Sequence, residues 1–342
     1  MDGVTEKKRI VIVVMSGNML LNFSGPSDIF VNANSCLKAS GRPEGYEVII
    51  AAPTADKKVT ANTGVEIHCP YCVMDIAEPV DTLIIAGNDM SAKGMERLAA
   101  FHHWLAHINK DAFRRIASIC GGAFALAKAG LLNGKKASTH WERTAKLQKE
   151  YPAVQVNADD FFTIDGNIYT SAGVSSGLDL SLAMVEEDYG KDIALKVARK
   201  LVFYLSRPGY QSQFGNLIPI YEPVNIAGKM QRWLREHLHE PLDVSRLAFQ
   251  CNMSIRNFTR VFHKQTGISP AKYIEKLRVE AARTLLQDTD MPLERIAEQC
   301  GLVSLVGMRR TFLRHMNVTP SDYRRTFQTA LKDIVTAQLI MS

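Results

Sequence analysis

RIASICGGAFALA, at residues 115–127, most strongly indicates the fold, because an apolar strand turns here directly into a helix. Residues 115–119 suit a short buried strand, and Cys120 stands at the turn, before Gly121 and Gly122. Glycines let the backbone bend sharply, so the cysteine is held at the tip of a sheet. N–H groups at a helix start lower the pKa of a thiol, and we therefore expect Cys120 to be partly thiolate.

Segments rich in Val and Ile alternate with helical patterns on both sides of this elbow. Strands are predicted at residues 10–15, 46–51, 81–85 and 115–119, and helices at 26–37, 95–108 and 122–129. Residues 161–171 predict a hairpin around Asp165 and Gly166, followed by closing helices at 178–187 and 193–204. Strands that alternate with helices form a parallel sheet covered on both faces, which predicts an α/β fold.

The composition changes at residues 206–224, which are polar and rich in Gly and Pro and predict a linker. Beyond it every segment predicts helix, and a unit of about fifty residues is repeated. Leu247-Ala248 recurs as Ile296-Ala297, and the later residues recur at an offset of 50. The recurring pairs are Ser254 and Ser304, Phe262 and Phe312, and Tyr273 and Tyr323. The second part is therefore predicted to be all-α, with two copies of a helix-turn-helix.

The first copy has the pattern of a helix that enters a DNA groove. Asp243 is the expected N-cap of its first helix and Ser254 that of the second. Phe258, Val261 and Phe262 share one face of that second helix, which leaves a polar, basic face outward. A short capped helix with such an outer face fits the major groove of DNA. The predicted DNA-binding residues here are Ser254, Arg256, Asn257, Thr259 and Arg260.

The second copy is capped at Ser304, with Met308 and Phe312 predicted to face inward. Leu305, Val306 and Gly307 occupy the positions that enter the groove, so hydrogen-bonded base readout is expected to be poorer. Thymine methyl contact and phosphate anchoring remain alternatives for this copy. Its predicted DNA-binding residues are Ser304, Arg309, Arg310 and Arg314. A helix over residues 269–287 joins the copies and spans about 30 Å, close to one turn of duplex.

Charge and composition agree with this division. The 342 residues carry a net charge of +6, and residues 225–327 alone carry 17 Lys and Arg against 10 Asp and Glu. A basic surplus confined to this part indicates an anionic partner such as double-stranded DNA. Six unevenly spaced cysteines indicate a reducing compartment, and no stretch reaches the roughly 18 apolar residues of a membrane span. We therefore expect a cytoplasmic protein with no membrane partner.

Residues 225–327 resemble the AraC/XylS DNA-binding domain. Met253-Ser254, Phe258, Phe262 and residues 266–270 resemble its first motif, and residues 277–286 its connecting helix. Residues 296–301 and 318–324 resemble the second motif. The resemblance implies two helix-turn-helix motifs in a transcription regulator, with Arg256, Thr259, Arg260 and Arg310 facing bases.

Residues 9–205 resemble the PfpI-like, class I glutamine amidotransferase-like fold. The matching pieces are residues 25–30, the Cys120 elbow, and residues 131–137, 139–141 and 173–179. The resemblance implies a flavodoxin-like sheet and a sensor for small nitrogenous metabolites. Hydrolases of this fold often carry an acidic residue where Asn22 stands. An amide is no general base, so ligand binding is favoured over turnover.

The expected ligand-binding residues are Asn22, Cys120, Gly121 and His140. A buried structural cysteine beside a satisfied histidine is the plain alternative. Two functional alternatives are a cysteine-dependent hydrolase and a redox sensor that reacts through Cys120. Residues 68–72 hold a CxxC without a second ligand pair, and His103 and His107 have no acidic partner nearby in sequence. No metal or cofactor is therefore predicted.

The expected organisation is a sensing and dimerisation domain at 1–205, a linker at 206–224, a DNA-binding domain at 225–327 and a tail at 328–342. The expected partners are promoter DNA, a small-molecule effector and a second copy of the chain, because closed two-fold dimers are the commonest assembly. RNA polymerase is a further candidate partner.

Overall fold

The structure is a computed structural model that describes residues 7–203 and 225–327, apart from residues 78, 90 and 159. The chain divides into two compact units, Met1–Arg207 and Pro208–Ser342. The predicted linker at 206–224 and the tail at 328–342 lie outside the described residues.

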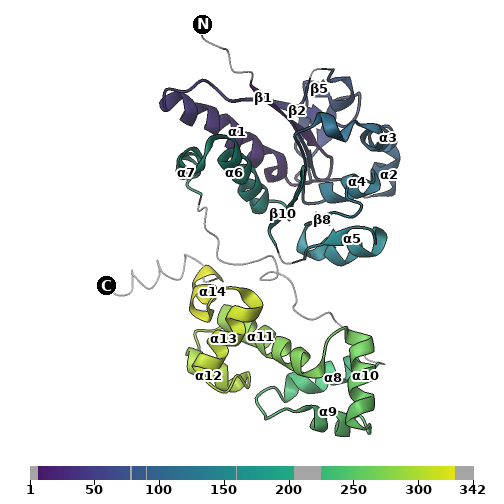
Figure 1. Ribbon diagram of the computed structural model, residues 1–342, viewed down its shortest axis with the longest axis vertical. Helices are drawn as coiled ribbons and strands as arrows, with labels where there is room; N and C mark the ends of the chain where they lie inside the picture. The colour runs from purple at the N-terminus through teal and green to yellow at the C-terminus, as the bar shows by residue number, and fades with distance from the viewer. Residues whose placement is uncertain (1–6, 78, 90, 159, 204–224, 328–342) are drawn as a thin grey trace. The chain divides into compact units, whose positions relative to one another are not determined.

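A seven-stranded sheet forms the centre of the first unit (Figure 1). Its order is β10-β11-β7-β6-β1-β2-β5, and the pairings are parallel except that of β10 with β11. Taken without the hairpin strand β10 and the short edge strand β5, the order is the flavodoxin-like 2-1-3-4-5, which confirms the predicted fold class. The strands are β1 Lys8–Val14, β2 Tyr46–Ala52, β5 Tyr71–Cys72, β6 Thr82–Ala86, β7 Arg115–Ile119, β10 Phe162–Asp165 and β11 Ile168–Ser171. Two small ribbons pair β3 Lys58–Thr60 with β4 Glu66–His68, and β8 Lys136–Ala137 with β9 Gln155–Val156.

Helices cover both faces of the sheet. On one face, α1 Leu21–Ala39, α6 Ser175–Tyr189 and α7 Lys191–Lys200 share a buried apolar cluster with the strands. On the other, α3 Ala99–His107, α4 Gly122–Lys128 and α5 Thr144–Glu150 contribute to a second cluster. The helix predicted at 95–108 is two helices, α2 Ala92–Arg97 and α3. Leu98 leaves helical geometry between them while its side chain is buried in the second cluster.

Buried charges tie the start of β7 to the end of α6. The Arg115 guanidinium is fully buried and donates to Asp188 Oδ2 at 2.9 Å and to Glu187 Oε2 at 2.7 Å. Arg114 also donates to Asp188, at 2.7 Å, and Tyr46 donates its hydroxyl to the same carboxylate. Burial alone would raise the pKa of Asp188, but hydrogen bonds from Arg115 and Arg114 outweigh it and lower the pKa.

The second unit is helical among its described residues, as predicted. Its helices are α8 Ile226–Glu236, α9 Val244–Gln250, α10 Ile255–Thr266, α11 Pro270–Asp288, α12 Leu293–Gln299, α13 Leu305–Met316 and α14 Pro320–Phe327. The repeat gives two matching cores. Phe262 meets Tyr273 edge to face at 5.0 Å in the first, and Phe312 meets Tyr323 at 5.3 Å in the second.

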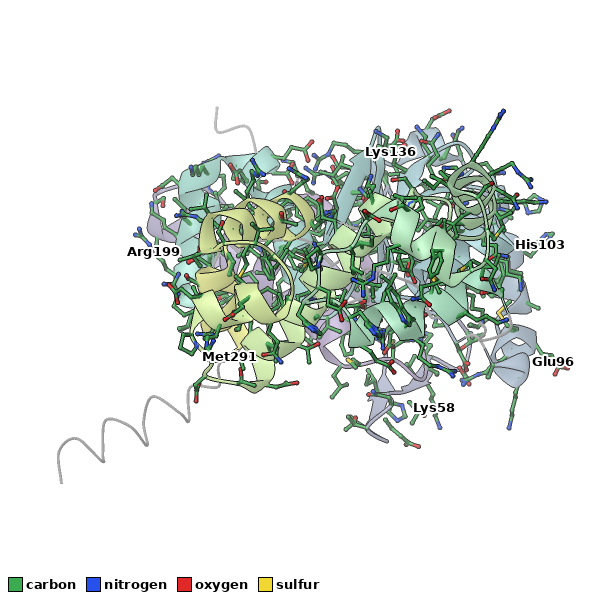
Figure 2. All side chains as sticks on the ribbon, turned by 90° about the horizontal axis from the view of Figure 1, so that it is seen from below. Lys58, Glu96, His103, Lys136, Arg199 and Met291 are labelled. Carbon is green, nitrogen blue, oxygen red and sulfur yellow. The ribbon has the colours of Figure 1, made fainter. Side chains whose placement is uncertain are left out.

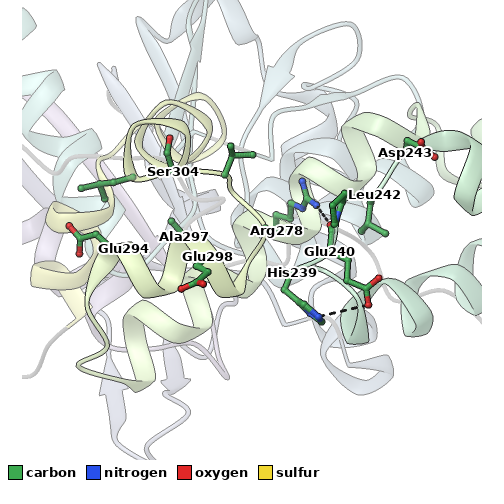
Figure 3. A pocket seen from close by; sticks show the side chains of 13 residues that line it. His239, Glu240, Leu242, Asp243, Arg278, Glu294, Ala297, Glu298 and Ser304 are labelled. Carbon is green, nitrogen blue, oxygen red and sulfur yellow. Dashed lines mark hydrogen bonds and ion pairs between the residues drawn. The ribbon is translucent and has the colours of Figure 1, made fainter.

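α11 belongs to both cores and fixes the two motifs to each other. Tyr273 and Leu277 pack in the first core, whereas Val279 and Leu286 pack in the second. Arg278, midway along, donates to the backbone oxygen of Leu238 at 3.3 Å. It also donates to the backbone oxygen of Glu240 at 2.9 Å (Figure 3). A Cβ at Gly301 would lie 2.1 Å from the Leu238 oxygen. The turn of the second motif therefore packs directly against the backbone that Arg278 binds, and we call this contact the Arg278 junction.

Candidate functional site

Cys120 occupies a strained elbow at the carboxyl end of β7. Its φ is +55°, a left-handed value that residues other than glycine seldom adopt. Its N–H donates to Ser171 O at 3.0 Å, and its carbonyl accepts from the Thr139 hydroxyl at 2.8 Å. A side chain at Gly122 would lie 2.1 Å from Ile85 O, so the helix starts tightly against β6. Strain of this kind is retained where surrounding contacts enforce it, often at functional sites.

The loop after β11 closes over the cysteine. A Cβ atom at Gly173 would lie 2.3 Å from Cys120 Cβ and 3.0 Å from its Sγ, so only glycine fits there. The next residue, Val174, has a φ of +50° and donates its N–H to Asn22 Oδ1 at 2.8 Å. Asn22 is buried in the first turn of α1. Asn22 and Cys120, which the sequence placed in one site, are thus joined through Gly173 and Val174.

Two polar groups that sequence reasoning missed lie beside Gly121. A Cβ at Gly121 would be 3.0 Å from Arg143 Nη1 and 3.2 Å from the backbone N of Asn88. Asn88 is only 6% exposed, and its Oδ1 atom is buried without a hydrogen-bond partner. Its position was open to prediction, because it follows β6 and ligands of parallel sheets gather at the carboxyl ends of strands.

Burial sets the protonation of the site. It raises the pKa of the Cys120 thiol, although the Arg143 charge and the Gly121 N–H act in the opposite direction. The expectation of a partly thiolate Cys120 is therefore wrong, because desolvation outweighs the helix start. Burial also lowers the pKa of His140, so this imidazole is neutral near pH 7.

His140 is connected to the cysteine elbow through the residue that precedes it. It follows Thr139, which binds the Cys120 carbonyl, and its Nδ1 lies 3.7 Å from Glu142 Oε2. Its ring packs against Trp141 with centroids 5.7 Å apart. Cys120, Gly121, Thr139, His140 and Arg143 thus come from two segments that the elbow brings together. These two segments meet where Thr139 binds the Cys120 carbonyl and where Arg143 approaches Gly121.

The remaining histidine and cysteine candidates take structural positions. His103 and His107 lie on the exposed side of α3, with their rings 4.3 Å apart, and His103 is at the periphery in Figure 2. His102 beside them is instead buried, and burial lowers its pKa to about 4. Cys69, just after β4, and Cys72, in the edge strand β5, are both buried, and burial raises the pKa of Cys69 to about 11. Among the described residues no group of three His, Cys, Asp or Glu side chains could hold a metal ion.

In the second unit, α10 has the cap and faces that its sequence predicts. Ser254 accepts from Asn257 N at 3.4 Å, while Asp243 caps α9 in the same way at 2.8 Å. Phe258 and Phe262 are buried. Arg256, Asn257 and Arg260 are exposed, Thr259 is half-buried, and Arg260 donates to Asn257 Oδ1 at 2.9 Å.

α13 repeats this arrangement. Ser304 accepts from Gly307 N at 3.1 Å, Met308 and Phe312 are buried, and Arg309 and Arg310 are exposed. Arg314 differs, because its Nη1 is bound to Glu275 Oε1 of α11 at 2.9 Å. Part of its charge is thus balanced within the domain.

No helix within the described part of the chain is long and apolar enough to cross a membrane.

The DJ-1/PfpI family model matches residues 8–187 and a helix-turn-helix domain model matches residues 247–326. The chain therefore belongs to the DJ-1/PfpI family and carries an AraC-type helix-turn-helix domain, which makes it a DNA-binding transcription regulator. It is 30% identical over 278 residues to the HTH-type transcriptional regulator GbdR of Pseudomonas aeruginosa, covering 79% of this chain and 72% of GbdR. It is 25% identical to the HTH-type transcriptional regulator GlxA of Rhizobium meliloti, covering 93% of this chain and 96% of GlxA. Both resemblances drawn from the sequence are confirmed.

An enzyme also shares the first unit. Isonitrile hydratase of Pseudomonas putida is 30% identical over 152 residues, which cover 44% of this chain and 63% of the hydratase. The fold of the first unit is therefore found in a catalyst as well as in regulators.

Proposed function

We propose that the first unit is a sensor that binds a small nitrogen-containing metabolite beside Cys120 and thereby changes DNA binding by the second unit. The observation that carries this proposal is the unpartnered Oδ1 atom of Asn88. A buried acceptor without a donor is costly, and an N–H group of a ligand would satisfy it. An amide, amine or amino acid supplies such a group.

The neighbouring residues would complete the site. Gly121 lies close to Arg143, whose positive charge suits an oxygen-rich end of the same molecule. His140 and Cys120 add a neutral imidazole and a neutral thiol. The predicted contact residues Cys120, Gly121 and His140 therefore surround the ligand, while Asn22 acts by holding Val174.

The chemistry of these groups favours binding over turnover. A nucleophilic cysteine needs a thiolate or an adjacent base, whereas burial keeps this thiol protonated. The Asn22 amide accepts a backbone hydrogen bond and has no proton-accepting carboxylate. The named regulators among the relatives support the same reading.

We further propose a cytoplasmic homodimer that uses the two-motif unit to bind paired sites on promoter DNA, with RNA polymerase as a downstream partner. The proposed DNA contacts are Ser254, Arg256, Asn257, Thr259, Arg260, Ser304, Arg309, Arg310 and Arg314. A ligand changes DNA affinity only through a different affinity for two states, and couplings of about 1–3 kcal/mol are typical.

The test is a thermal-shift screen of the full chain against amino acids, betaines, polyamines and small amides. Each stabilising compound is then incubated with the protein, recovered and weighed by mass spectrometry. We expect an intact ligand whose stabilisation is lost in Asn88→Leu and kept in Asn32→Ala, a half-buried residue of α1 whose amide donates to Asp28 O in the same helix. A compound returned with altered mass would support the cysteine-dependent hydrolase instead, and stabilisation unaffected by Asn88→Leu would rule out this site.

A further inference from the structure

The second motif presents apolar side chains at the position where the first motif presents an arginine. At the repeat offset of 50, Val306 of α13 corresponds to Arg256 of α10. Both follow a serine N-cap by two residues, and both helices are 12 residues long. The two side chains therefore leave matching backbones in matching directions.

Val306 is 78% exposed and Val303, in the turn before α13, is 96% exposed. Val303 also has a φ of +62°, a left-handed value that is rare for a β-branched residue. Neither position contributes to the second core, which Met308, Phe312 and Met316 fill from the other side of the helix. Packing within the domain thus gives no reason for valine at either place.

The surroundings of these valines suit DNA. Val303, Val306 and Arg310 line one open hollow of about 490 Å³. Two carboxylates that also line it have internal partners, since Asp243 caps α9 and Glu275 binds Arg314 and His315. Arg309 and Arg310 are exposed one turn after Val306 on the same helix, so two cationic side chains lie beside an apolar patch. Such a patch complements a groove edge that is anionic outside and carries a methyl group inside.

We propose that Val303 and Val306 read thymine methyl groups in the major groove and so set the sequence preference of the second motif. The C5 methyl of thymine is the apolar feature that distinguishes this base in that groove, and apolar side chains recognise it by contact. The first motif reads its half-site by hydrogen bonds, and the second reads its half-site by apolar contact with thymine. Arg309 supplies a phosphate contact that keeps the valines in place.

The experiment uses the full-length protein and the duplex that it selects from a random-sequence pool. Each thymidine of that duplex is replaced singly by deoxyuridine, which removes the methyl group and keeps the base pairing. Burial of one methyl corresponds to roughly a four-fold change in affinity. We expect a loss of about that size at one or two positions of a single half-site.

Variants assign the effect to the residues. Val306→Ala is expected to lose a similar factor on the thymine duplex and to be indifferent to deoxyuridine at the sensitive position. Val306→Thr keeps one methyl and the shape of the side chain, so it is expected to fall between. Arg256→Ala serves as the control, because it should weaken binding to both duplexes equally and keep their ratio.

Thermal unfolding checks that each variant remains folded, as the exposure of Val306 leads us to expect. Equal binding of both duplexes by the wild type, or a deoxyuridine penalty that persists in Val306→Ala, would overturn the proposal. So would a selected site without thymine in the second half-site. A Val306→Ala variant that binds DNA normally but fails to activate RNA polymerase would make the patch a protein contact and would also overturn it.

Discussion

The Oδ1 atom of Asn22 accepts a hydrogen bond of 2.8 Å from the N–H of Val174, a residue 152 positions further along the chain. This bond holds a loop whose neighbouring residue, Gly173, touches the Cys120 side chain. The start of α1 and the cysteine elbow are therefore coupled through one amide.

Replacing Asn22 by Ala should lower the free energy of unfolding by about 1–3 kcal/mol, because a buried N–H is left without a partner. Urea titration followed by circular dichroism measures the change. Asn32→Ala on the same helix is the control and should cost no more than about 0.5 kcal/mol. Equal losses for the two variants would mean that the bond to Val174 contributes nothing specific.

Gly173→Ala should be more damaging than the left-handed backbone alone explains. Gly173 and Gly190 both have positive φ, at +95° and +88°, but only Gly173 faces another atom, Cys120 Cβ at 2.3 Å from an added Cβ. Gly190→Ala is expected to cost about 1–3 kcal/mol, because its backbone, with φ +88° and ψ 163°, lies in a region that glycine almost alone adopts. Gly173→Ala should exceed this and also reduce ligand stabilisation in the thermal-shift assay. A Gly173→Ala protein with unchanged ligand response would separate this loop from the sensor.

The Cys120 thiol should alkylate slowly at neutral pH. Burial raises its pKa, and the thiolate is the reactive form, so the iodoacetamide rate should reach its midpoint above the pH typical of free cysteine. Arg143→Gln removes the charge that favours the thiolate and should move the midpoint higher still. Mass spectrometry of the peptide that contains Cys120 gives the rate. A midpoint below that of free cysteine would revive the redox-sensor alternative.

The buried cluster at the end of α6 should dominate acid stability. Asp188 has a lowered pKa, so its contribution is present above the ordinary aspartate pKa of about 3.9 and is lost as pH falls through the lower folded value. Arg115→Met leaves that carboxylate with less compensation and should cost about 3–5 kcal/mol at pH 7. Arg97→Met breaks the exposed pair with Asp56 and should cost at most about 1 kcal/mol. Urea titrations at pH 7 and pH 3 compare the variants, and similar losses for both would contradict the assigned role of Asp188.

The predicted DNA contacts should separate by their dependence on salt. Arg256→Ala and Arg260→Ala are expected to lose about 1–3 kcal/mol of specific binding and to relax base preference. Arg309→Ala should weaken all sequences alike and reduce the salt slope by about one. Arg314→Ala should lose less than Arg309→Ala, because Glu275 already balances part of its charge. Fluorescence anisotropy at several salt concentrations measures these differences. Unchanged binding in both Arg256→Ala and Arg260→Ala would contradict the proposal that α10 enters the major groove.

Most of the fold could be predicted from local sequence patterns. The strand at 115–119 has the predicted bounds, and the caps at Asp243, Ser254 and Ser304 are those expected, because capping depends on a few adjacent residues. The break at Leu98 was missed, since it depends on how one side chain enters the core.

The site was less accessible to sequence reasoning for the same reason. Asn22 and Cys120 were both named, but Asn88 and Arg143 join them only after the sheet has formed. The thiol pKa was predicted in the wrong direction because local helix geometry is visible in sequence, whereas the burial supplied by the loop at Gly173 is not.

The Arg278 junction also bears on the design of the promoter. Since α11 and Arg278 hold the two motifs as one body, the half-sites that they read must keep one helical phase. Each inserted base pair rotates one half-site by about 34° around the duplex axis, given 10–10.5 base pairs per turn. Two rigidly joined motifs cannot follow such a rotation. The spacing between the half-sites is therefore part of the DNA sequence that this protein recognises.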